Sequence, residues 1–251
     1  MAGHSKWANI QHRKGKQDKI RAKVFTKVGR EIIVAAKLGG GDPDMNPRLR
    51  LAIQKAKAVN MPNDRIKKAI DTGAGNSDQT NYEEVRYEGY GPGGTAIVVD
   101  ALTDNRARTF AEVRTAFGKF GGNLGETGSV GFMFDRVGQI IYPIDKADGD
   151  TMFEAAVEAG AENCESEGDI HVITTGMDDL AAVRDALEGT FGEAEKCELI
   201  WQPNTMSEIN EDQVSSMLKL IDALEDDDDV QTVTSNMDVA DDVMEKLMAA
   251  E

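Results

Sequence analysis

Gln-Ile-Ile-Tyr-Pro-Ile at residues 139–144 is the first of four runs that decide the fold of this chain. The second run surrounds Cys164, the third is Ile-His-Val-Ile-Thr at 170–174, and the fourth is Cys-Glu-Leu-Ile-Trp at 197–201. Short runs rich in β-branched and other apolar residues, separated by Gly, Asp and Asn, are typical of β-strands. We therefore predict four strands between residues 139 and 201.

Two helices are predicted between these strands, at 151–159 and 177–187, because apolar residues recur there at helical spacing. In the first helix this spacing places Phe153, Ala156 and Val157 on the inner face. The resulting order is strand–helix–strand–strand–helix–strand, which is the ferredoxin-like split βαβ arrangement. We predict that residues 136–202 form one α+β domain.

A second α+β pattern lies on both sides of this domain in the sequence. Strands are predicted at 85–87 and 95–102, followed by a helix that begins after Asp104-Asn105 and by a short strand at 130–134. The helix has four apolar residues on one face, namely Phe110, Val113, Phe117 and Phe120.

The helix and strand that this first part lacks follow at 210–224 and 230–234. We therefore predict a middle domain made of residues 81–135 plus 203–240, split by the inserted domain at 136–202. Both domains are expected to be ferredoxin-like.

The N-terminal part is predicted to be helical and basic. Ile20, Val24, Val28 and Ile32 recur every four residues in a helix from about 18 to 38, which ends at Gly39-Gly40-Gly41. Two shorter helices follow, one starting at Asn46-Pro47 and one ending near residue 73. The fold class is thus α+β with three domains: a basic arm and three-helix domain in residues 1–80, and two ferredoxin-like α+β domains, one inserted in the other.

Charge is distributed very unevenly along the chain. The net charge is −17, but residues 1–80 contain 17 Lys and Arg against 7 Asp and Glu, a net charge of +10. Residues 81–251 contain 11 Lys and Arg against 38 Asp and Glu, a net charge of −27. A basic head on an acidic body indicates a polyanionic partner for the head. The alternative is that the head docks on its own acidic body, which could also compete with nucleic-acid binding.

The head offers cations for phosphates, together with Trp7, His4 and His12 for stacking on unpaired bases. We expect residues 1–17 to be a mobile basic arm. The predicted nucleic-acid contacts are His4, Lys6, Trp7, His12, Arg13, Lys14, Lys16, Lys19, Arg21, Lys23, Lys27, Arg30, Arg48 and Arg50. The second and third helices resemble a helix-turn-helix, but three-helix bundles are common, so spacing alone does not indicate recognition in the major groove.

No sequence pattern indicates catalysis or a cofactor. The segment at 89–94 matches no phosphate-binding loop, because a strand follows it, and we predict a turn between two strands. His171 has acidic neighbours, but no metal-ligand spacing is present, so no metal is expected. We also predict no enzyme activity, no cofactor and no small-molecule substrate.

The segment Ile32–Ala36 is far shorter than the roughly 20 apolar residues that span a bilayer. No basic segment is followed by a long apolar one, so neither a membrane partner nor a secretory signal is expected. A basic, acid-poor start could also be a mitochondrial transit peptide, although Ser and Arg are few here. Cys164 and Cys197 are too far apart for a C-x-x-C motif, which agrees with a cytoplasmic, reducing location.

Seven motifs together resemble the YebC/PmpR family. They are Ala-Gly-His-Ser-Lys-Trp-Ala-Asn-Ile at 2–10, Lys-Leu-Gly-Gly-Gly-Asp-Pro at 37–43, Asn-Pro-Arg-Leu-Arg at 46–50, Tyr-Glu-Gly-Tyr-Gly-Pro-Gly-Gly-Thr at 87–95, Asp-Asn-Arg at 104–106, Gly-Gly-Asn-Leu-Gly at 121–125 and Gly-Ser-Val at 128–130. The resemblance runs from residue 2 to about residue 240. It implies a helical first domain and two α+β domains, one inserted in the other.

The resemblance also implies a function. Bacterial members are described as cytoplasmic DNA-binding transcriptional regulators, some bacterial members are linked to ribosome function, and mitochondrial relatives are translational activators. The residues and the resemblance agree on a non-catalytic nucleic-acid-binding regulator of gene expression. Promoter DNA and ribosomal RNA both stay open as targets.

Overall fold

The computed structural model describes residues 19–75 and 81–239, with side chains from residue 23 onward. The chain divides into two compact units. Unit 1 combines residues 1–77 with 136–200, and unit 2 combines 78–135 with 201–251. Each unit is therefore built from two separate stretches of the sequence.

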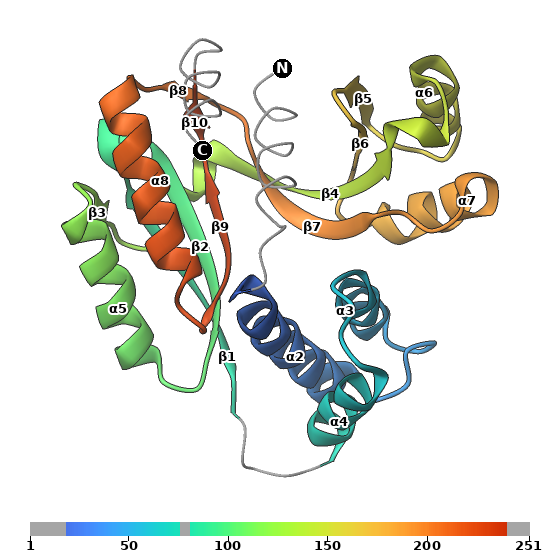
Figure 1. Ribbon diagram of the computed structural model, residues 1–251, viewed down its shortest axis with the longest axis horizontal. Coiled ribbons are helices and arrows are strands. Elements are labelled where there is room, and N and C mark those ends of the chain that lie inside the picture. The colour runs from blue at the N-terminus through green and yellow to red at the C-terminus, as the bar shows by residue number, and fades with distance from the viewer. Residues whose placement is uncertain (1–18, 76–80, 240–251) are drawn as a thin grey trace. The chain divides into compact units, whose positions relative to one another are not determined.

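The helical part of unit 1 consists of α2 (Lys19–Gly39), α3 (Pro47–Ala58) and α4 (Asn63–Ala74). Helix α2 packs against both α3 and α4 (Figure 1). Their core contains Ile32 and Leu49, both fully buried, with Ala and other small residues where the helices approach. The predicted basic three-helix bundle is confirmed.

The second part of unit 1 has the predicted α+β order. Its elements are β4 (Phe134–Pro143), α6 (Gly149–Glu158), β5 (Asn163–Glu167), β6 (Ile170–Thr175), α7 (Leu180–Phe191) and β7 (Lys196–Pro203). The sheet order is β5-β6-β4-β7, and β4 and β6 are antiparallel at the centre, with Ile140 opposite Ile173. This is the ferredoxin-like order, and it buries Ile140 and Ile173 together with residues of both helices.

Unit 2 contains a second four-stranded sheet, whose order is β3-β1-β2-β9. Its elements are β1 (Glu83–Tyr90), β2 (Ala96–Thr103), α5 (Arg106–Lys119), β3 (Asn123–Leu124), β8 (Ser207–Glu208), α8 (Glu211–Glu225), β9 (Val230–Ser235) and β10 (Met237–Asp238). Strand β9 pairs with β2, so the last part of the chain completes a sheet begun more than a hundred residues earlier. Helices α5 and α8 lie side by side over the sheet (Figure 1). The α+β fold class is confirmed; the exact boundaries of three domains stay a prediction.

The connection between the central strands differs in the two sheets. In unit 2, β1 and β2 form a direct hairpin, with Tyr90 opposite Ala96 across the glycine-rich turn. Gly93 and Gly94 both have φ of 75°, a conformation that glycine adopts without steric cost. The predicted turn between strands is confirmed, but it spans residues 91–95, because Gly89 and Tyr90 still belong to β1.

Two local predictions are wrong. Residues 131–133 form a 3₁₀ turn rather than part of a strand, and the short strand is instead β3 at 123–124. The physical reason is that the amides of Val130 and Gly131 donate to the carboxylate of Glu88 at 2.9 and 2.7 Å, so they do not join a ladder.

The second error concerns helix faces. Phe110, Phe153 and Val157 are 44%, 49% and 51% exposed, although an inner position was predicted for each. In α6 the buried positions are Met152 and Ala156, so the inner position predicted for Ala156 is confirmed, while Met152 is buried in place of Phe153.

Candidate nucleic-acid interface

The three-helix bundle concentrates positive charge on a small scaffold. Helices α2, α3 and α4 carry 13 Lys and Arg and 3 Asp and Glu. Asn46 fixes the turn between α2 and α3: its buried side chain accepts from the Leu49 amide at 3.0 Å and donates to Ala35 O and Gly40 O, both at 2.8 Å. One side chain thus caps α3 and holds the end of α2.

Twelve of the 14 predicted contact residues fall into three groups. Seven lie outside the described residues: His4, Lys6, Trp7, His12, Arg13, Lys14 and Lys16. Lys19 and Arg21 belong to the first turn of α2, where only the backbone is described. Lys23, Lys27 and Arg30 are half-buried on α2 and take part in interactions within the protein. Their roles as contacts stay a prediction.

Arg48 and Arg50 have structural partners. Arg48 makes a two-point contact with Glu31, from Nε to Oε1 at 2.8 Å and from Nη2 to Oε2 at 3.2 Å, which joins α3 to α2. Arg50 donates to the carbonyl oxygens of Pro43 at 3.2 Å and Asp44 at 2.9 Å. Both guanidinium groups therefore stabilise the bundle, whatever else they contact.

Three further cations belong to the candidate interface. Lys57 on α3 and Lys67 and Lys68 on α4 are exposed, and none was among the predicted contacts. The buried positions Ile66 and Ala69 could have revealed the α4 pair, since residues 67 and 68 must then face outward. Exposed lysines contact phosphates as point charges and carry no base specificity.

Lys55 has an acidic partner within unit 1. Its Nζ lies 3.0 Å from Oε2 of Glu198 on β7. The two charges act on each other, so the pKa of Lys55 is raised and the pKa of Glu198 is lowered. Leu51, one turn earlier on α3, packs against the core around Ile140. This face of α3 therefore contacts the acidic part of unit 1, as the docking alternative proposed for the head requires.

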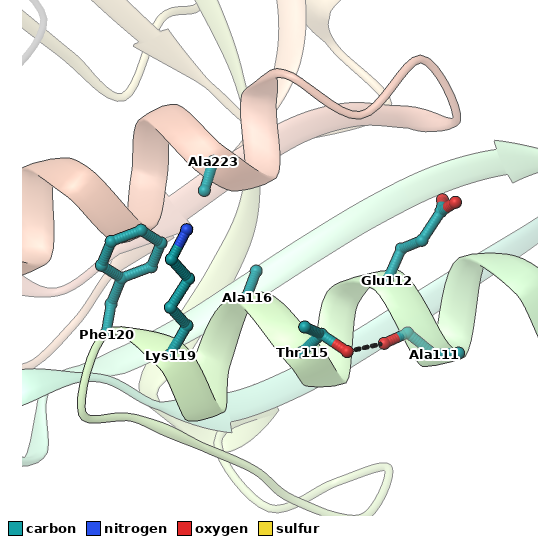
Figure 2. Close-up of a pocket in the computed structure, with 7 residues that line it drawn as sticks. All are labelled: Ala111, Glu112, Thr115, Ala116, Lys119, Phe120 and Ala223. Atoms are coloured by element: carbon teal, nitrogen blue, oxygen red, sulfur yellow. Dashed lines mark hydrogen bonds between the residues drawn. The ribbon is translucent and has the colours of Figure 1, made fainter.

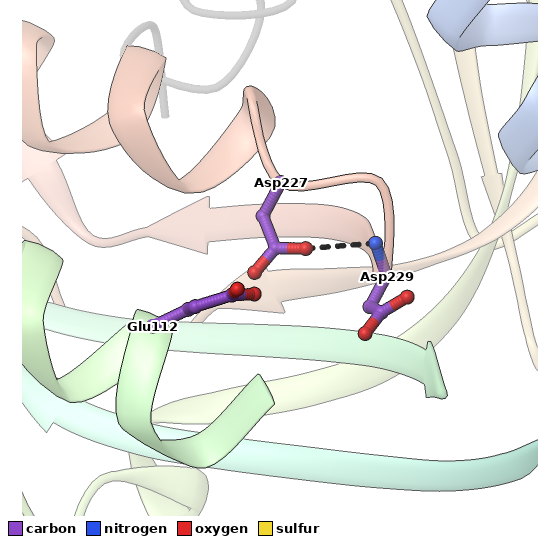
Figure 3. Close-up of side chains that lie close together, drawn as sticks. All are labelled: Glu112, Asp227 and Asp229. Carbon is purple, nitrogen blue, oxygen red and sulfur yellow. Dashed lines mark hydrogen bonds between the residues drawn. The ribbon is translucent and has the colours of Figure 1, made fainter. Parts of the chain in front are cut away.

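Unit 2 contains a group of three acidic side chains, Glu112, Asp227 and Asp229, with carboxylate oxygens within 4.8 Å of one another (Figure 3). Oδ2 of Asp229 accepts from Arg108 Nη2 at 2.6 Å, and also from Thr109 and Thr103 hydroxyls. Burial and then the charge of Asp227 raise the pKa of Glu112. The acidic group therefore has a structural role: its contacts connect α5 and β2 to the turn before β9.

A shallow pocket of about 360 Å³ lies between α5 and α8. Figure 2 shows that alanines and Phe120 form much of its wall, with Glu112 and Lys119 apart from each other. Its lining residues include no His, Cys or Ser, and the Thr115 hydroxyl donates to the carbonyl oxygen of Ala111 at 2.7 Å.

His171 is a fully buried structural residue. Its Nδ1 lies 2.7 Å from the Ser166 hydroxyl, and Nε2 lies 3.1 Å from Ala147 O and 3.3 Å from Ile144 O. Because carbonyl oxygens only accept, Nε2 carries a proton; in the neutral imidazole Nδ1 is then the acceptor for the Ser166 hydroxyl. Both ring nitrogens are thus occupied.

Within residues 19–75 and 81–239, no helix has the length and apolar content to cross a bilayer. The fold and the site together define a class: a modular α+β protein whose basic helical bundle is joined to acidic ferredoxin-like sandwiches.

Comparison with known proteins identifies the family of this chain. Residues 5–76 match the model of the TACO1/YebC protein N-terminal domain, and residues 82–237 match the model Transcrip_reg, the TACO1/YebC second and third domain. The chain belongs to the TACO1/YebC family. A similar solved structure is the conserved hypothetical protein Aq1575 from Aquifex aeolicus, with 44% sequence identity, a TM-score of 0.84, and coverage of 89% of this chain and 93% of that chain.

Proposed function

We propose that this protein is a non-catalytic nucleic-acid-binding regulator of gene expression, acting in the cytoplasm as a DNA-binding transcriptional regulator. The observation that carries the proposal is the concentration of 13 basic residues on α2–α4 in a chain with a net charge of −17. The family model for residues 82–237 bears a name that denotes transcriptional regulation, which supports the same conclusion.

Binding to ribosomal RNA is the second candidate. The guanidinium groups of Arg48 and Arg50 contact Glu31 and backbone carbonyls, whereas the exposed cations of α3 and α4 include three lysines, Lys57, Lys67 and Lys68, and Arg65, whose guanidinium lies over the Phe25 ring. Lysines hold phosphates without base recognition, so the bundle suits a folded polyanion as well as a promoter. Trp7 in the basic arm would add stacking on unpaired bases.

The test is the salt dependence of binding by the full chain. If about 4–8 phosphates are contacted, log K should fall with log salt at a slope of roughly −4 to −7 on duplex DNA, and less steeply on single strands. Replacing Lys14, Lys16, Arg21, Lys23 and Lys27 by Gln should flatten the slope and weaken binding to all sequences alike.

The body contains five lysines, which provide a matched control with the same change in charge: Lys119, Lys146, Lys196, Lys219 and Lys246. Their replacement by Gln should leave the slope nearly unchanged. If the head variant binds as well as the wild type across salt, the head is not the binding surface, and docking on the acidic body becomes its function.

Trp7→Ala separates the two targets. If the arm stacks on bases, binding to unpaired RNA should weaken by about 1–3 kcal/mol and binding to duplex DNA by less. Equal losses on both would show that Trp7 only packs against protein.

A further inference from the structure

Helix α5 is a basic element in an acidic unit. The segments that form unit 2, 78–135 and 201–251, contain 7 Lys and Arg and 23 Asp and Glu. Four of the 7 basic residues lie on α5, namely Arg106, Arg108, Arg114 and Lys119. This local reversal of charge needs a structural explanation or a partner.

Arg108 has a structural explanation, because its guanidinium contacts Asp104 at 2.9 Å and the buried Asp229 at 2.6 Å. Arg106 and Arg114 do not. Both are exposed, and among the residues that the structure describes no ion pair or hydrogen bond holds either guanidinium group. The two arginines are therefore available to an anion outside the protein.

An exposed aromatic ring lies between them. Phe110 follows Arg106 by four residues and precedes Arg114 by four, so the three side chains form a line along one flank of the helix, with about 6 Å of rise per step. Phe110 is 44% exposed, and its ring centroid lies 6.3 Å from that of Tyr87 on β1. We call Arg106, Phe110 and Arg114 the α5 stripe.

The chemistry of the α5 stripe selects one class of partner. A single exposed apolar residue is common and needs no explanation, but here two unpaired guanidinium groups flank it within an acidic unit. A flat apolar ring between two cations fits an unpaired base with its neighbouring phosphates. A duplex fits less well, since its bases are already stacked and its dense charge is repelled by the 23 acidic residues.

We propose that the α5 stripe binds single-stranded RNA, with Phe110 stacked on one unpaired base and Arg106 and Arg114 on flanking phosphates. The inference rests on the proposed nucleic-acid-binding function and adds a second contact surface, outside the basic head.

The test uses the full chain and a fluorescent single-stranded 12-mer RNA of mixed sequence, with duplex DNA of the same sequence for comparison. Phe110→Ala should weaken RNA binding about 5- to 150-fold, and Phe110→Tyr should restore most of it. Arg106→Gln with Arg114→Gln should weaken binding and reduce the salt slope by about 1.4, at 0.7 per phosphate. Phe153→Ala is the matched control, because Phe153 is 49% exposed on an acidic helix.

Unchanged RNA binding by both Phe110→Ala and the double arginine variant would overturn the α5 stripe. The proposed function would stand in that case if the head variant, with its five cations replaced by Gln, loses binding. Failure of the wild type to bind either nucleic acid would overturn both. Thermal unfolding verifies that the variants fold. If Phe110→Ala does not fold, the arginine pair decides the result, because no hydrogen bond or ion pair among the described residues holds either guanidinium group.

Discussion

At the scale of single residues, Glu88 shows how a charged group is kept inside the protein. It is 4% exposed, yet burial does not leave it neutral. Burial alone would raise its pKa, but donation from the amides of Val130, Gly128 and Gly131, with the nearby charge of Arg86, lowers the pKa overall. Glu88 therefore anchors the loop at 128–131 to β1 as a carboxylate.

Glu88→Gln should lower the free energy of unfolding by about 1–3 kcal/mol at pH 7, because hydrogen bonds to the charged form are lost. The folded pKa lies below the unfolded value of about 4.3, so the contribution is complete above that value and is lost as pH falls through the folded pKa. Urea unfolding of both proteins between pH 3 and pH 7 measures this. A difference in stability that stays constant down to pH 3 would contradict the role of the charge.

At the scale of elements, most helices and strands could be predicted because their apolar residues recur at helical or strand spacing. The starts of several helices are also marked by a capping residue. Asn46, Asn105 and Asn210 each cap a helix through the side chain, as the sequence indicated for the first two. The failures have two causes. Glu88 accepts from the amide of Val130, 42 residues away, and such a long-range contact leaves no local pattern. In α6 the buried residue is Met152 rather than Phe153, and two neighbouring large apolar residues do not show from the sequence which one faces the core.

Substitutions of Asn46 can separate its role as the cap of α3 from its hydrogen bonds to the end of α2. Asn46→Ala removes both, and should cost about 2–4 kcal/mol in the stability of α3, combining a lost cap with buried acceptors left unpaired. Asn46→Ser keeps a side-chain acceptor for the Leu49 amide but cannot supply both donors to Ala35 O and Gly40 O, so its loss should be intermediate. Hydrogen exchange of the α3 amides measures both. Equal exchange in the two variants would mean that the cap contributes little.

At the scale of the whole molecule, the uneven distribution of charge could be predicted from the sequence more reliably than the residues of the nucleic-acid interface. The basic head and the acidic body follow from the numbers of charged residues in the sequence. Of the 14 predicted contacts, however, seven lie outside the described residues, and two others, Arg48 and Arg50, have partners within the helical bundle. Burial and pairing decide which cations are available, and neither can be read from charge. The α5 stripe was missed for this reason, since periodicity placed Phe110 inside.

Residues 81–251 should fold without the head, although not unchanged. Removal of residues 1–80 takes away the Lys55 contact to Glu198 and the packing of Leu51 against the core around Ile140. We expect the shortened chain to unfold cooperatively in urea, at a lower midpoint than the full chain. A gradual transition with binding of a hydrophobic dye would indicate a molten state and a wrong boundary.

The pairing of β9 with β2 has a consequence for folding during synthesis on the ribosome. Residues 136–200 are synthesised before residues 230–235, so the sequence of the inserted sandwich is complete while the sheet around it still lacks its edge strand. At about 5–20 residues per second, β2 waits on the order of 10 s for its partner. Its exposed edge during that interval is a place where a chaperone, or another nascent chain, can bind first.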